Sequence, residues 1–78
     1  MNRLTLQEMN TIKIVYRYYP EGKDVFGRIV YLFSNKEASV EEKAQGDDTG
    51  YYAHKATKKV EECVSKNYLP MEITQAWY

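Results

Sequence analysis

The 78-residue sequence is poor in the residues that carry most enzyme and metal chemistry. It contains one cysteine, Cys63, and one histidine, His54. A single cysteine excludes an intramolecular disulfide and is typical of a reducing compartment. One His and one Cys are too few for a structural zinc site, which takes four such ligands. On a helix these two residues would lie about 13 Å apart along the axis, so they predict no nucleophile–base pair in one chain.

An excess of one charge and long apolar runs are also missing. Lys and Arg number 11, as do Asp and Glu, so the formal net charge is zero. This balance disfavours nucleic acids and anionic membranes as partners, because both attract basic proteins. No apolar run is long enough to span a bilayer, and residues 1–9 lack the apolar core of a signal peptide. We therefore expect a cytoplasmic protein with no membrane contact.

Catalytic constellations, metal-ligand spacings and Gly-rich nucleotide loops are not found either. The acidic residues nearest to a metal-binding pattern lack the spacing of a Ca²⁺ loop and its terminal Glu; these are Glu41, Glu42, Asp47 and Asp48. The sequence therefore predicts no enzyme, no catalytic residues, no bound metal and no cofactor.

Apolar and aromatic residues, by contrast, are sufficient for one folded domain. The hydrophobic fraction is 44%, and it includes eight Tyr, two Phe and one Trp, which argues against disorder. A chain of this length buries only about 60% of its unfolded surface, and small cores often gain stability by oligomerising. We expect residues 1–78 to form a single small domain that self-associates.

Two runs of β-branched and aromatic residues, Thr11–Tyr19 and Phe26–Phe33, predict an antiparallel hairpin. The loop Pro20–Val25 separates them, because Pro20 cannot donate to a β-ladder and Gly22 can adopt a positive φ. Side chains alternate between the two faces of a strand. The first strand therefore divides into two sets, Ile12, Ile14, Tyr16 and Tyr18 against Lys13, Val15, Arg17 and Tyr19.

The second strand of the hairpin divides in the same way. One face carries Ile29, Tyr31 and Phe33, and the other carries Phe26, Arg28, Val30 and Leu32. The pairing register stays open at this point, because a slip of one residue would exchange the faces. With either register, both faces of the hairpin carry large apolar side chains.

The segments before and after the hairpin have weaker patterns. Leu4, Leu6 and Met9 predict a short strand or a helical turn packed against the hairpin. Residues Ala38–Lys43 predict a third strand whose charges suit a sheet edge, with Ala38 and Val40 inward. A helical turn is the alternative for this segment, because Glu and Lys are good helix formers.

Residues Tyr51–Lys66 have the periodicity of an amphipathic helix. The apolar stripe consists of Tyr52, Ala53, Ala56, Val60, Cys63 and Val64. Asp48 or Thr49 is expected to cap its first turn, and Asn67 its end. After Pro70, a final strand is expected within Met71–Tyr78, from Ile73, Thr74, Trp77 and Tyr78.

These elements predict an α+β fold. We expect a mostly antiparallel four-stranded sheet of the order β-β-β-α-β along the chain, with one amphipathic helix packed on one face. The last strand should lie beside the strand at residues 11–19 and parallel to it, which gives the spatial order 4-1-2-3.

A single helix can cover only one face of this sheet. The other face would then expose an apolar patch of the kind that marks interaction sites, unless residues 1–10 cross it or Lys and Arg stems shield it. We therefore predict a non-enzymatic interaction module, a homodimer formed through this face or through an exposed sheet edge. Tyr and Arg are favoured at interfaces, and the expected contact residues are Val15, Arg17, Tyr19, Arg28 and Val30.

Two other functions remain open. Single-stranded nucleic acid often binds aromatic and basic residues on a sheet, which here would be Arg17, Arg28, Tyr16 and Tyr31. Alternatively, the chain could be a small enzyme or ligand-binding protein whose site forms only between subunits and joins His54 to acidic residues of another chain.

Overall fold

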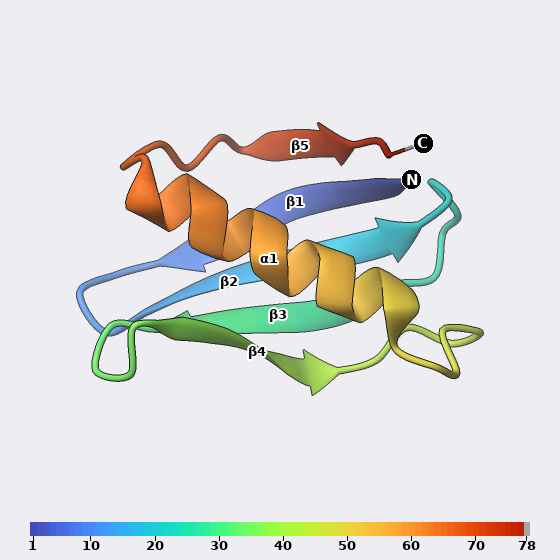
Figure 1. The fold of residues 1–78 in the computed structure, drawn as a ribbon, viewed down its shortest axis with the longest axis horizontal. Coiled ribbons are helices and arrows are strands. Elements are labelled where there is room, and N and C mark those ends of the chain that lie inside the picture. The colour runs from blue at the N-terminus through green and yellow to red at the C-terminus, as the bar shows by residue number, and fades with distance from the viewer. Residues whose placement is uncertain (78) are drawn as a thin grey trace.

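The computed structural model describes residues 1–77, and it shows a five-stranded sheet crossed on one face by a single helix (Figure 1). The elements along the chain are β1 (Asn2–Met9), β2 (Lys13–Pro20), β3 (Gly27–Leu32), β4 (Glu37–Glu42), α1 (Tyr51–Ser65) and β5 (Glu72–Gln75). The strands lie in the order β4-β3-β2-β1-β5, and every neighbouring pair is antiparallel. The predicted α+β class is confirmed, but the predicted strand count was one too low.

The strand missing from the predicted sheet is β1, formed by the N-terminal segment, for which a short strand was one of two expectations and is the one observed. It lies between β2 and β5, with Leu4 opposite both Tyr18 and Ile73. The predicted order 4-1-2-3 is therefore wrong, because β1 separates β5 from β2. The predicted direction of β5, parallel to β2, is correct. Because residues 2–9 extend the sheet sideways, they do not cover its second face.

The β2–β3 pairing fixes the register that the sequence left open. Tyr16 lies opposite Ile29, and Ile14 lies opposite Tyr31. All four side chains are buried in the core beneath α1. The predicted division of both strands into two faces is correct, and α1 covers the face that carries Tyr16. Ile12 is the exception, since it precedes β2 and is 69% exposed.

The strand β4 forms one edge of the sheet, as its charged residues predicted. Its Ala38 is half-buried, whereas Val40, opposite Ile29, is 40% exposed. The backbone N–H of Ala38 donates a hydrogen bond of 3.0 Å to the Glu61 carboxylate. This contact from α1 occupies a donor of an edge strand, which limits further strand pairing there.

Helix α1 packs on the sheet through small side chains. Its buried residues are Ala53, Ala56, Thr57, Val60 and Cys63, close to the predicted stripe. The helix ends at Ser65, and Asn67, two residues beyond it, has a left-handed φ of 55°. The N–H groups of Asn67 and Tyr68 donate to the carbonyls of Val64 and Cys63, both at 3.0 Å. These two bonds form a Schellman motif, so the expected role of Asn67 is confirmed.

Alkaline pH should destabilise this fold through its two fully buried tyrosines. Burial raises the pKa of Tyr16 and of Tyr18 from 10.0 to about 12. Their neutral forms therefore contribute full stability below pH ~10, and the contribution is lost as the pH rises from ~10 towards ~12. Urea unfolding across this range should show a falling free energy of unfolding. Tyr16→Phe should reduce the slope, and an unchanged slope would contradict this assignment.

Candidate interaction face

The five predicted contact residues lie together on the sheet face opposite α1, here called the open face. Val15 pairs with Val30 across the two central strands, and Arg17 pairs with Arg28. Tyr19 follows on β2, opposite Arg3 of β1. Alternation along β2 and β3 points these side chains away from the helix-covered core, and Figure 1 shows α1 lying across the other side.

The valines at the centre of the open face are not exposed. Val15 is 1% exposed and Val30 8%. Around them, guanidinium groups lie on aromatic rings: Arg17 is 4.1 Å from the ring centre of Phe26, and Arg3 is 4.2 Å from that of Tyr19. The open face is therefore a layer of stacked Arg and aromatic groups over a small apolar centre, as the shielding alternative supposed.

The charges on the open face are paired at its sides but not at its centre. Arg3 lies 3.6 Å from Glu72 of β5. The Nε of Arg28 lies 3.0 Å from Glu41 of β4, although its N–H is not well directed at an acceptor. Within residues 1–77, Arg17 makes no ion pair.

The arginines at this centre change the pKa of the Tyr19 hydroxyl. Burial opposes ionisation of the phenol, but hydrogen bonding from Arg17 and Thr5 outweighs it, together with the charges of Arg17 and Arg3. The net effect lowers the pKa of Tyr19 below its usual 10.0. A carboxylate or another anion would be favoured at this point of the face.

The structure divides the residues named for nucleic-acid binding. Tyr16 and Tyr31 are buried in the core, so they cannot stack on bases, whereas Arg17 and Arg28 lie on the open face. The aromatic side chains next to Arg17 are Phe26 and Tyr19, whose rings also contact each other. No pattern in the sequence distinguishes Phe26 from a core residue.

The candidates for chemistry on α1 are separated from the open face. His54 is exposed on the helix, and Cys63 is buried against the sheet. Burial raises the pKa of the Cys63 thiol above its usual 9.0, which disfavours the reactive thiolate.

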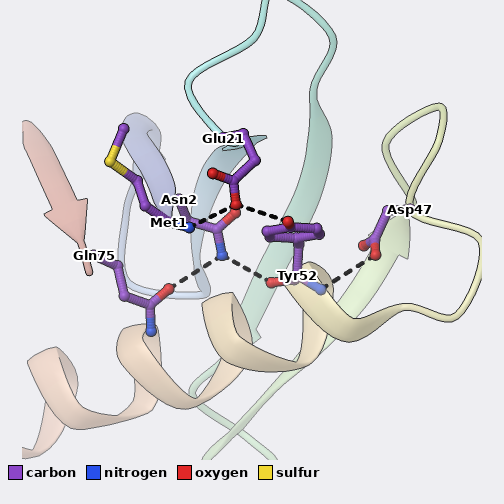
Figure 2. Close-up of polar contacts among 6 residues, drawn as sticks. All are labelled: Met1, Asn2, Glu21, Asp47, Tyr52 and Gln75. Carbon is purple, nitrogen blue, oxygen red and sulfur yellow. Dashed lines mark hydrogen bonds and ion pairs between the residues drawn. The ribbon is translucent and has the colours of Figure 1, made fainter. Parts of the chain in front are cut away.

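A polar cluster that no sequence pattern predicted joins the sheet to α1 (Figure 2). Asn2 is fully buried, and its side-chain amide donates to the Tyr52 carbonyl at 2.9 Å and to Gln75 Oε1 at 3.1 Å. Glu21 accepts hydrogen bonds from the Met1 amino group at 2.9 Å and the Tyr52 hydroxyl at 2.7 Å. These contacts tie β1, the β2–β3 loop and β5 to the first turn of the helix.

The carboxylate of Asp47 stabilises the same turn from the other side. It accepts hydrogen bonds from the backbone N–H of Tyr52 at 3.2 Å, the N–H of Ala53 at 2.9 Å and the hydroxyl of Tyr18 at 2.9 Å. The expectation that Asp48 or Thr49 caps the helix was therefore wrong, because Asp47 accepts the hydrogen bonds from the Tyr52 and Ala53 N–H groups. Thr49 accepts only a longer bond, 3.3 Å from the Tyr51 N–H.

An apolar cavity of about 530 Å³ lies at the end of the molecule where α1 finishes. It is lined by Met9, Asn10, Thr11, Ile14, Phe33, Val64, Asn67 and Leu69. These side chains are apolar or carry an amide or a hydroxyl, so the cavity suits an apolar group better than a charged one. The sequence contained no signal for it, because the lining residues come from three separate segments, 9–14, residue 33 and 64–69.

No three His, Cys, Asp or Glu side chains of residues 1–77 are grouped as metal ligands. In that part of the chain, no helix is long and apolar enough to cross a membrane.

Comparison of the chain with protein family models, characterised proteins and solved structures gives no match.

Proposed function

We propose that this protein is a non-enzymatic interaction module that self-associates through the open face. The observation that supports this proposal is the grouping of Val15, Arg17, Tyr19, Arg28 and Val30 on one side of the sheet, opposite α1. Arg and aromatic side chains are enriched at interfaces and often supply most of the binding energy. Two sheets can pack face to face at about 10 Å.

The stacked arrangement lowers the entropic cost of association. Arg17 and Arg3 already rest on aromatic rings in the single chain, so less side-chain freedom is lost when a partner binds. Because Val15 and Val30 are largely covered, the contact surface consists mainly of Arg and aromatic groups. This composition is typical of a reversible interface rather than an obligate one.

Arg17→Glu tests the proposal, because it places a carboxylate at the centre of the face. Sedimentation equilibrium over a range of concentrations should show the wild-type mass rising from monomer towards dimer. The dissociation constant of Arg17→Glu should be about tenfold higher or more, since a like charge at a docking surface costs affinity. Lys58→Glu makes the same charge change on the exposed side of α1 and should leave the dissociation constant unchanged.

Two results would contradict the proposal. One is a wild-type chain that stays monomeric at the highest concentration reached. The other is an Arg17→Glu variant that remains folded by circular dichroism and associates like wild type.

A further inference from the structure

We infer that Glu41 of a second copy supplies the carboxylate that Arg17 lacks within residues 1–77 of its own chain. The inference rests on the proposed self-association through the open face, and it names the charge pair that aligns the two copies there.

Among the described residues 1–77, no acidic side chain offsets the charge of Arg17. Arg17 lies directly across from Arg28, and like charges opposite each other in a sheet are destabilising. Glu41 offsets the charge of Arg28, and Glu72 offsets that of Arg3. In the described part of the chain, Arg17 contacts the ring of Phe26 and the hydroxyl of Tyr19. The side chain has five N–H donors in a flat fork, which suits a carboxylate.

Glu41 has the matching surplus of acceptors. Its side chain is 49% exposed and contacts Arg28 through Oε1, whereas a carboxylate offers about four acceptor positions. It lies on the edge strand β4, two strands away from the β2 strand that carries Arg17. The open face thus has a basic centre and an acidic border, which are complementary to each other but separated within one chain.

A two-fold axis that runs parallel to β3, between the two facing sheets, brings this centre and border together. Such an axis places β2 of one copy opposite β4 of the other, so Arg17 faces Glu41 of the second copy and the contact occurs twice. The partly exposed Leu32 of both copies then lies near the axis, next to the largely covered Val30. Arg28 also lies near the axis, where its own Glu41 offsets its charge.

A charge exchange tests this pairing. Dissociation constants are measured by sedimentation equilibrium for wild type, Arg17→Glu, Glu41→Arg and the double variant, with folding checked by circular dichroism. Each single variant should weaken association about tenfold or more, and the double variant should recover to within about threefold of wild type. Arg28 keeps an acidic neighbour in the double variant, because the new carboxylate at position 17 lies directly across from it.

Glu72→Arg is the matched control, since it removes the other acid paired to an arginine on this face but lies on β5, far from the axis. It should leave the dissociation constant within about threefold of wild type. A double variant as weak as the weaker single variant would overturn the Arg17–Glu41 pairing and leave self-association standing, as would a loss with Glu72→Arg equal to that with Glu41→Arg. A monomeric wild type would overturn both proposals.

Discussion

Replacing Gly27 with alanine is expected to lower the free energy of unfolding by about 3 kcal/mol, at the upper end of the cost of overpacking. Gly27 begins β3, directly opposite Tyr18. A Cβ atom at this position would lie 2.5 Å from the Glu42 carbonyl oxygen and 2.6 Å from the Ala44 nitrogen, and closer still to the Tyr18 ring. Two of these neighbours are backbone atoms, so a change of side-chain rotamer cannot relieve the contact.

The size of this effect should be plain in a chain of 78 residues. At 0.05–0.15 kcal/mol per residue, the total stability is about 4–12 kcal/mol, so Gly27→Ala should remove a large part of it. The melting temperature should fall by about 15 °C, at 4–8 °C per kcal/mol. Thermal and urea unfolding followed by circular dichroism measure both quantities.

Gly46→Ala is the control for this variant. A Cβ atom added at Gly46 would meet no neighbouring side chain or backbone within 4 Å, but the φ of Gly46 is +90°. Alanine there should cost only the backbone strain of a positive φ, about 1–2 kcal/mol. In an ordinary strand alanine is more favourable than glycine by about 0.5–1 kcal/mol. A neutral or stabilising effect of Gly27→Ala would therefore contradict the close packing described above.

The hairpin and the helix could be predicted from the sequence because each has a long, regular pattern. The runs of β-branched and aromatic residues in β2 and β3 reflect strands in which most positions are buried, including Val15 and Val30 on the open face. The three- and four-residue spacing in α1 reflects a single stripe packed on the sheet. Both patterns record burial, which is the physical quantity that hydrophobic periodicity measures.

The strand β1 could not be predicted with the same certainty. Of its alternate residues, Leu4 is fully buried but Asn2 is buried as well, held by hydrogen bonds to Tyr52 and Gln75. A buried polar residue breaks the apolar alternation that identifies a strand, and its partners lie 50 and 73 residues away. Only the completed fold shows that the side-chain N–H groups of Asn2 find acceptors there.

The character of the open face also depended on contacts between separate segments. The sequence placed five residues on this face, and the β2–β3 register brings them together. The sequence could not show that Arg17 reaches Phe26, which directly precedes β3, or that Arg3 of β1 covers Tyr19. These stacking contacts require the β1–β2 pairing and the loop conformation, neither of which local periodicity determines.

Asp47→Ala is expected to lower the free energy of unfolding by about 3–4 kcal/mol. The loss of a helix cap costs about 0.5–2 kcal/mol, and each buried donor left without an acceptor adds about 1–3 kcal/mol. Asp47 is 3% exposed and accepts from two N–H groups of the first helical turn and from the Tyr18 hydroxyl. The variant leaves all three donors without this acceptor.

Asp48→Ala separates this specific role from a general effect of negative charge near the helix. Asp48 is exposed, and its side chain makes no hydrogen bond within residues 1–77, so its removal should change stability by less than about 0.5 kcal/mol. Equal losses for the two variants, measured by urea unfolding, would show that the helix dipole and not the hydrogen bonds explains the effect.

Tyr18→Phe then tests whether Asp47 acts as part of a network. The Tyr18 hydroxyl donates to Asp47 and accepts the Ala44 N–H at 2.8 Å, so one group links β2 to the β4–α1 connection and to the helix start. Tyr18→Phe should cost about 1–3 kcal/mol, because the buried Ala44 N–H loses its acceptor. Combined with Asp47→Ala, the loss should be smaller than the sum of the two single losses by about 1 kcal/mol, since the shared hydrogen bond can be removed only once. Strict additivity would mean that the two residues stabilise the helix start independently.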